Sequence, residues 1–194
     1  MGRYLVCVTG ASGSVYGLRV ASALIEAGHE VHAIFSPWGA RVMLQETGEA
    51  PESWSARLGL SADRVYAPDN LAAPPSSGTF RLDGTVIVPC SMSTLGALAS
   101  GAAANLVHRA GGVALKEGRP LILVPREAPL SLVDLRNMTA LAEAGATILP
   151  ASPGFYHKPT TVDQLVDFVA GKILDRLGLG HRLFEPWDGR QVSP

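Results

Sequence analysis

The chain is short of the residues on which disulfide-rich and membrane-embedded proteins depend. Its 194 residues include only two cysteines, Cys7 and Cys90, and both lie in apolar runs, which excludes a disulfide framework and indicates reduced thiols. No apolar run approaches the roughly 20 residues of a membrane span. The run Tyr4–Val8 is also too short for a signal sequence. We therefore expect a cytoplasmic protein that does not enter the membrane.

Charge is scarce as well. Charged residues make up 17% of the chain, the formal net charge is −1, and no basic run stands out. Nucleic acid and anionic membranes are therefore not expected as partners. Hydrophobic residues, by contrast, make up 47%. We expect oligomerisation to cover part of this apolar surface.

Several catalytic signatures are missing from the sequence. The five histidines form no metal-spaced pair, and C-x-x-C, H-E-x-x-H and G-x-S-x-G motifs do not occur. No Walker lysine follows the amino-terminal glycines, which disfavours a nucleoside triphosphatase. The aspartate-rich pairs that hold magnesium diphosphate in many prenyl-transferring enzymes are absent too. We expect no metal site and metal-independent chemistry.

What the sequence does contain is a regular alternation of β-rich runs with helical patterns. This alternation predicts an α/β fold with a doubly wound, mainly parallel sheet and helices on both faces. Strands are expected at 4–9, 31–35, near 65, and at 85–89, 121–124 and 146–149. Helices are expected at 15–27, 40–46, 105–117, 132–144 and 162–177, with a further stretch from 94 that Gly101 interrupts.

Two regions depart from this alternation. Residues 48–80 are rich in proline and weakly periodic, and we interpret them as an irregular excursion rather than a second domain. Residues 181–194 form a polar tail that is either mobile or an arm onto a neighbouring subunit. The prediction is therefore one domain over residues 1–180 followed by the tail.

Polar and glycine residues gather where the predicted strands end. Ligands of open α/β sheets bind at the carboxyl ends of the strands. The residues at these ends suit a phosphate together with a planar, hydrogen-bonding ring; they are Gly10, Gly13, Ser36, Ser91, Ser93, Thr94, Arg126, Glu127 and Tyr156. We also expect the helix after Gly13 to present its free amides to an anion.

Each of these features has a simpler explanation that the sequence leaves open. The glycines fit a tight turn without a ligand, and Ser91 fits a helix cap. Arg126 and Glu127 fit a surface ion pair, and Lys172 fits a lysine that lies along the apolar face of the last helix. Arg109 and Lys116 lie near one side of their predicted helix, which fits a solvated helix face.

Six sequence runs taken together resemble the flavin prenyltransferase (UbiX) family. They are T-G-A-S-G-S-V-Y-G-L-R, A-P-P-S-S-G, P-C-S-M-S-T-L, N-L-V-H-R-A, A-L-K-E-G-R-P-L-I-L-V-P-R-E-A-P and A-G-A-T-I-L-P-A-S-P-G-F-Y-H-K-P, in this order along the chain. The resemblance extends from about residue 4 to residue 178. It implies a Rossmann-like flavoprotein that transfers a dimethylallyl group from dimethylallyl monophosphate to N5 and C6 of reduced FMN. The product, prenylated FMN, would serve a partner decarboxylase of the UbiD type.

The resemblance also implies roles for individual residues. It assigns FMN binding to a set at the strand ends: Gly10, Ala11, Ser12, Gly13, Ser36, Ser91, Met92, Ser93, Thr94 and Arg126. It assigns the phosphate of the donor to Arg109, Lys116, Tyr156 and Lys172. Glu127 is implied as the acid/base residue, with Ser12 and Glu46 as further active-site groups. In this family the sites lie between subunits of a large homo-oligomer, commonly a dodecamer.

The sequence departs from the family pattern at two places. Lys172 stands at a position where arginine is also found in the family. Lysine keeps the positive charge but cannot form the two parallel hydrogen bonds of a guanidinium. Gly111-Gly112 replaces an alanine and an acidic residue and is expected to loosen that helix turn. The rival interpretations are a flavin-dependent peptidyl-cysteine decarboxylase, whose P-A-S-A-N-T turn is missing here, and a non-catalytic flavin-binding module.

Overall fold

The computed structural model describes residues 1–187 and 189 of the chain, and its centre is one six-stranded sheet. The strand order is β3-β2-β1-β4-β5-β6, and all five pairings are parallel. The strands are β1 Arg3–Val8, β2 Glu30–Phe35, β3 Val65–Tyr66, β4 Gly84–Cys90, β5 Leu121–Pro125 and β6 Thr147–Ile148. The chain thus winds outward in both directions from β1 and β4, which confirms the predicted doubly wound fold.

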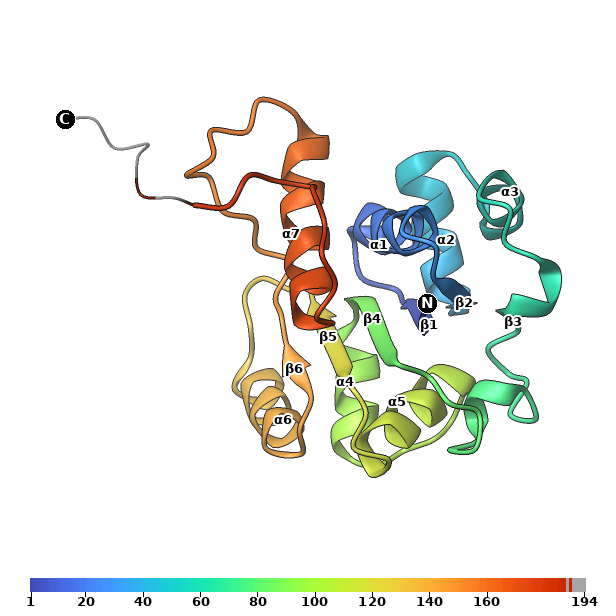
Figure 1. Cartoon of the computed structure of the whole chain (residues 1–194). Helices are drawn as coiled ribbons and strands as arrows, with labels where there is room; N and C mark the ends of the chain where they lie inside the picture. Colours follow the sequence, from blue (N-terminus) through green and yellow to red (C-terminus); the bar gives the residue numbers. More distant parts are fainter. Residues whose placement is uncertain (188, 190–194) are drawn as a thin grey trace.

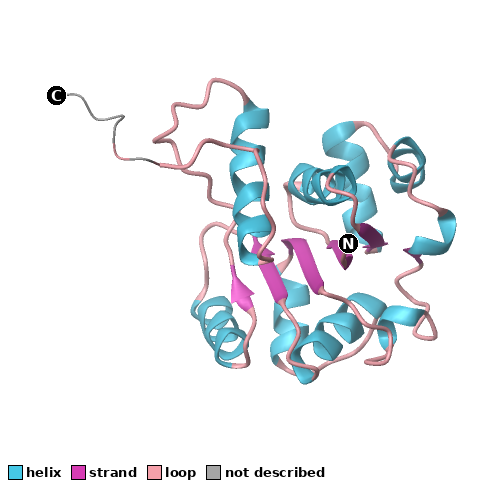
Figure 2. Cartoon of the chain, viewed as in Figure 1, coloured by secondary structure: helices cyan, strands magenta, loops and turns pink. Residues whose placement is uncertain are grey.

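Helices cover both faces of the sheet (Figures 1 and 2). They are α1 Ser14–Glu26, α2 Pro37–Thr47, α3 Pro51–Arg57, α4 Met92–Ala99, α5 Leu106–Lys116, α6 Leu132–Glu143 and α7 Val162–Arg176, with short 3-10 turns at Ala62–Arg64 and Pro74–Ser76. None of the helices in the described part of the chain combines the length and apolar character that crossing a membrane requires.

The two faces of the sheet carry separate hydrophobic cores because strand side chains alternate in direction. On β1, Val6 and Val8 join the core beneath α1 and α7, whereas Leu5 and Cys7 join the core beneath α4 and α5. Alternate residues of every long strand are therefore buried on opposite sides. This explains why the strands read as continuous apolar runs.

One helix was missed by the sequence analysis. The excursion at residues 48–80 contains α3, which begins at Pro51. Proline is well suited to the first position of a helix because its missing N–H would have no partner there. Trp54 is 1% exposed, and its ring meets Phe35 edge-on at a centroid distance of 5.6 Å. Tertiary packing of one tryptophan thus fixes a seven-residue helix that periodicity does not reveal.

Glycines let two helices approach the strands closely where the site is built. A side-chain carbon at Gly17 of α1 would collide with the carbonyl oxygen of Val88 in β4. A side-chain carbon at Gly39 of α2 would collide with the carbonyl oxygen of Val8 at the end of β1. Both helices therefore begin directly against the carboxyl edge of the sheet.

Helix α5 runs without interruption through Gly111 and Gly112. The expected loosening at this pair is not seen in the helix bounds. A side-chain carbon at Gly111 would lie 2.6 Å from the Cδ2 atom of Leu98, so this glycine allows α4 and α5 to pack closely. Gly112 faces open space instead.

The apolar face of α6 is largely uncovered within one chain. Leu132, Val133 and Leu135 are 62%, 64% and 46% exposed, and Leu141 is the buried residue of this helix. Exposed apolar surface of this kind is typical of a protein–protein contact.

The start of the predicted tail packs on its own chain. Phe184 and His181 lie against α7 at Gly171, and the His181 Nε2 atom is 3.1 Å from the Asp175 carboxylate. Within one chain, these residues therefore pack against the last helix of the domain. Residues 188 and 190–194 of the predicted tail lie outside the described residues.

Candidate functional site

Two helices that begin at the carboxyl edge of the sheet are capped by serines. The Ser36 hydroxyl accepts a hydrogen bond from the Gly39 amide at 3.0 Å at the start of α2. The Ser91 hydroxyl accepts from the Thr94 amide at 3.3 Å and donates to the Thr94 hydroxyl at 3.1 Å at the start of α4. The cap explanation of Ser91 is confirmed, and Ser36 is a helix cap as well. Capping is compatible with anion binding, because both helices carry partial positive charge at these ends.

The amino terminus of α4 retains the capacity to bind an anion. The first N–H groups of a helix have no partner within the helix. Among the described residues, the amides of Met92 and Ser93 donate no hydrogen bond. Backbone amides of this kind bind phosphate well, particularly beside hydroxyl groups.

Thr9 joins the two central turns and was not singled out from the sequence. Its side chain is 1% exposed, donates to the Pro89 carbonyl at 2.7 Å and accepts from the Ser91 amide at 2.8 Å. The end of β1 is thereby fixed to the start of α4. The signal in the sequence was a hydroxyl residue at the last position of an apolar strand.

Glu46 occupies the amino terminus of α1. Its carboxylate accepts from the Gly13 and Ser14 amides, each at 2.9 Å, and from the Ser14 hydroxyl at 2.7 Å. Partial burial raises the pKa of Glu46, but hydrogen bonds from Ser12, Ser14 and the two amides outweigh this and hold it below its usual value. At the start of α1, the protein's own carboxylate therefore occupies two of the amides that we expected to face a bound anion.

The glycine turn Gly10–Gly13 lies between α2 and β5. Gly13 has φ 104°, a conformation that favours glycine, and a side-chain carbon at Gly10 would lie 2.6 Å from the Cβ atom of Trp38. Ala11 is buried. The Arg126 Nε atom donates to the Ser12 carbonyl at 3.2 Å, so the end of β5 is tied to this turn.

Two hollows flank Arg126. The first has a volume of about 400 Å³ and is lined by Ser12, Gly13, Glu46 and Arg126 on its polar side, with Tyr16 and Val166 among its apolar walls. The second has a volume of about 420 Å³ and contains Glu127, Met138 and Ser152. Arg126 and Ala151 line both hollows. Glu46 and Glu127, to which the resemblance assigns active-site roles, thus line two different hollows that share Arg126.

Glu127 is exposed in the described chain. Its carboxylate accepts a hydrogen bond at Oε1 from the amide of the next residue, Ala128, at 3.1 Å. Arg126 is instead engaged with Ser12. The simple ion-pair explanation of Arg126 and Glu127 is therefore not supported by the contacts within the described chain.

Tyr156 belongs to an aromatic cluster near α7. Its ring meets those of His157, Phe168 and Trp187 edge-on, at centroid distances of 5.7, 5.7 and 5.6 Å. Trp187 lies in the predicted tail, and its contact with Tyr156 was not predicted from the sequence. Tyr156 is 47% exposed.

Lys172 forms an exposed ion pair on the same helix. Its Nζ atom is 3.0 Å from the Asp175 carboxylate, and the lysine and aspartate side chains are 46% and 43% exposed. A pair of this kind contributes little stability and can exchange partners readily.

Arg109 and Lys116 line a different hollow, of about 330 Å³, together with Ser76 and His108. Its lining residues come mainly from α4, α5 and the segment between them. These two helices lie on the other side of the sheet from α7 (Figure 1). Lys116 is paired with the neighbouring Glu117. A single described chain therefore does not bring the four predicted phosphate ligands into one place.

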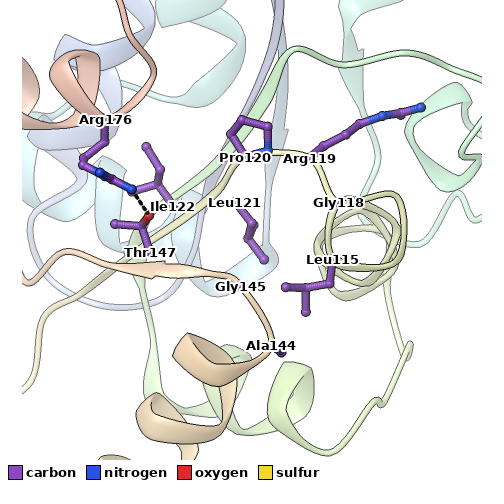
Figure 3. A pocket seen from close by; sticks show the side chains of 10 residues that line it. All are labelled: Leu115, Gly118, Arg119, Pro120, Leu121, Ile122, Ala144, Gly145, Thr147 and Arg176. Carbon is purple, nitrogen blue, oxygen red and sulfur yellow. Dashed lines mark hydrogen bonds between the residues drawn. The ribbon is translucent and has the colours of Figure 1, made fainter.

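A fourth hollow lies at the opposite, amino-terminal edge of the sheet (Figure 3). It has a volume of about 310 Å³, and an Arg176 Nη2 atom donates to the Thr147 hydroxyl there at 3.2 Å. None of the predicted site residues lines it. Among residues 1–187 and 189, no group of three or more histidine, cysteine or acidic side chains is arranged to hold a metal ion.

The fold and the serine-capped helix starts define a doubly wound α/β protein of the flavin-binding class. The family model described as Flavoprotein matches residues 2–174. Flavin prenyltransferase UbiX of Pseudomonas aeruginosa is 46% identical over 95% of this chain and 93% of its own. The corresponding protein of Thermoplasma acidophilum is 44% identical over 95% of this chain and 99% of its own.

Solved structures agree with this relationship. AnUbiX in complex with FMN and dimethylallyl pyrophosphate superimposes with a TM-score of 0.93 at 42% identity, covering 97% of this chain and 98% of that one. A dodecameric FMN-dependent UbiX-like decarboxylase from Escherichia coli gives a TM-score of 0.91 at 42% identity, covering 96% and 100%. The peptidyl-cysteine decarboxylase EpiD, at 18% identity and a TM-score of 0.61, shares the fold. The chain therefore belongs to the flavoprotein family and, within it, to the flavin prenyltransferases.

Proposed function

We propose that this enzyme transfers a dimethylallyl group from dimethylallyl monophosphate to N5 and C6 of reduced FMN, without a metal ion. The observation that carries the proposal is the division of roles at the carboxyl edge of the sheet. The starts of α2 and α4 present hydroxyls and amides suited to a phosphate, whereas the start of α1 carries the Glu46 carboxylate beside an apolar-walled hollow.

The residues at this edge fit FMN. Ser36, Ser91 and Thr94, with the amides of Met92 and Ser93, would hold the phosphate of the cofactor. The turn Gly10–Gly13 would line the flavin ring together with Arg126. It could approach the ring closely because two of its residues lack side chains. Reduced FMN supplies the nucleophilic atoms that the dimethylallyl group joins.

The donor phosphate would be bound by Arg109, Lys116, Tyr156 and Lys172, contributed by more than one subunit. One chain holds these groups in separate places, and the exposed residues Leu132, Val133 and Leu135 offer a surface for assembly. The dodecameric Escherichia coli relative supports a homo-oligomer, which we take to be a dodecamer. Replacement of Val133 by Asp should release smaller species in analytical ultracentrifugation and abolish prenyl transfer.

Each group has a role that follows from its chemistry. The cations Arg109, Lys116 and Lys172 would stabilise the negative charge that develops on the departing phosphate. The Tyr156 hydroxyl would donate a hydrogen bond to the phosphate of the bound donor, which contributes to donor binding. Glu127 would accept the proton released at C6 of the flavin. Ser12 and Glu46 would position groups near N5.

Anaerobic mass spectrometry tests the proposal. Purified protein, reduced FMN and dimethylallyl monophosphate should yield a flavin heavier by one prenyl unit. Glu127→Gln should bind both substrates and slow the formation of the finished product, whereas Glu143→Gln, an exposed carboxylate on α6, should behave as the unsubstituted enzyme. Recovery of unmodified FMN from a protein that binds FMN would contradict the proposal.

The wider context follows from this activity. Prenylated FMN would be handed to a UbiD-type decarboxylase, and we place both steps in the cytoplasm. Carbon dioxide release from a peptide with a carboxy-terminal cysteine is the assay for the rival decarboxylase activity. The remote identity to EpiD supports no more than a shared fold.

A further inference from the structure

Tyr156 and His157 are the two central residues of a tight turn. The Lys158 amide closes the turn by donating to the Phe155 carbonyl at 2.9 Å. The turn directs neighbouring side chains differently, since Tyr156 is 47% exposed whereas both ring nitrogens of His157 are buried. Lys158 follows with φ 52°, a left-handed conformation that is unfavourable for a residue with a side chain. The backbone thus tolerates strain next to a side chain assigned to substrate binding.

The His157 ring forms a platform for Tyr156. It stacks on Phe168 of α7 with an angle of 3° between the planes and 5.2 Å between centroids. The Tyr156 ring stands edge-on to both members of this stack, at 78° and 81°. Gly154 permits the arrangement, because a side-chain carbon there would lie 2.9 Å from Tyr156 and 3.1 Å from Phe168.

Hydrogen bonding does not explain the presence of His157. Neither Nδ1 nor Nε2 has a hydrogen-bond partner among the described residues, although both atoms are buried. Buried polar atoms without partners are unfavourable, so what the imidazole contributes in this position is the packing of its ring.

We infer that His157 is a positioning residue for the prenyl-transfer reaction, whose stacked ring holds the Tyr156 phenol where it meets the donor phosphate. The inference rests on the proposed function and extends it to a residue that does not touch the reacting atoms. If it holds, the loss of His157 weakens donor binding through Tyr156. The chemical step itself is left unchanged.

Steady-state kinetics with dimethylallyl monophosphate and reduced FMN test the inference, using His157→Ala, His157→Phe and His157→Gln. His157→Ala should raise KM for the donor about 5- to 10-fold and leave kcat within about 2-fold, the pattern of lost substrate binding. His157→Phe, which keeps a planar ring, should restore KM to within about 2-fold of the unsubstituted enzyme. His157→Gln, which keeps polar nitrogen but no ring, should resemble the alanine variant.

The double substitution separates positioning from a general loss of structure. In a Tyr156→Phe background, His157→Ala should add less than about 2-fold to KM, because the group it positions is already gone. Rescue by Gln rather than Phe, or full additivity with Tyr156→Phe, would overturn the inference. If His157→Ala does not fold, the comparison of Phe with Gln still decides. Failure of the unsubstituted enzyme to prenylate FMN would instead reject the proposed function.

Discussion

Replacement of Glu46 by Ala should lower the thermal stability of the protein by a predictable amount. The substitution removes the acceptor for two backbone amides and for the buried Ser14 hydroxyl. Hydrogen bonds to a charged group contribute about 1.5–3 kcal/mol each when buried. Because Glu46 is exposed, water replaces part of these hydrogen bonds in the variant. We therefore expect the free energy of unfolding to fall by about 2 kcal/mol in total, which is the upper end of the range for a lost helix cap. For a chain of this size the melting temperature should fall by about 4–8 °C.

The loss should depend on pH in a defined direction. The folded-state pKa of Glu46 is below its usual value, so its contribution is present above the unfolded pKa of about 4.3 and is lost as the pH falls through the folded value. The difference between the unsubstituted protein and Glu46→Ala should therefore be complete at pH 7 and should shrink below about pH 4. Glu46→Gln, which keeps an acceptor oxygen, should lose about half as much at pH 7.

Circular dichroism melts at matched protomer concentration provide the measurement, because assembly makes the melting temperature concentration-dependent. Glu143→Ala is the control, since this carboxylate is exposed and makes no side-chain hydrogen bond to the described residues. Equal melting temperatures for Glu46→Ala and the unsubstituted protein at pH 7 would show that the three hydrogen bonds do not stabilise α1. A difference that persists unchanged at pH 3.5 would show that the charge is not responsible.

Four further outcomes follow from the structure. Thr9→Val should destabilise the protein by about 1–3 kcal/mol, measured by urea unfolding, because the partly buried Ser91 amide loses its acceptor, whereas the Pro89 carbonyl keeps the Thr9 amide as a donor; a loss below about 0.5 kcal/mol would contradict this. Gly112→Ala should add about 0.5–1 kcal/mol to stability in the same assay, and Gly111→Ala less, because Leu98 must move. Cys90, whose pKa burial raises to about 12, should react with an aromatic disulfide reagent at pH 8 only on unfolding. Dialysis against EDTA should leave prenyl transfer unchanged, and recovery by added magnesium would reject the metal-independent proposal.

The strands and the long helices were predictable because burial of one or both faces makes apolar residues recur at a regular spacing in the sequence. On α7, Val169 and Ile173 are buried at the expected spacing. Helix α3 was not predictable, since its seven residues depend on Trp54 reaching Phe35 in β2. Short helices fixed by a single long-range contact carry no periodic signal of their own.

The strand ends were correctly predicted to gather Ser12, Ser36, Ser91 and Arg126 at one edge, because parallel strands share a direction. The contact of Glu46 with Gly13 could not be read from spacing. It joins residues 33 positions apart, and it depends on the close approach of α2 to the end of β1 at Gly39. Likewise, no pattern in the sequence separates Arg109 and Lys116 from Tyr156, because the face of the sheet that a helix covers depends on the crossover connections.

The Glu46 contact has a consequence for the charge balance of the whole edge. The helices α1, α2 and α4, which follow the three neighbouring strands β1, β2 and β4, begin at this edge, and each helix start attracts negative charge. At α1 this attraction is satisfied internally by Glu46, whereas at α2 and α4 it is met only by neutral serine hydroxyls. We therefore expect a phosphate to bind at the starts of α2 and α4 rather than at the glycine turn. Exchange of Glu46 for an uncharged residue should therefore allow phosphate to compete for the start of α1, which makes the carboxylate a determinant of where the cofactor binds as well as of how firmly α1 is held.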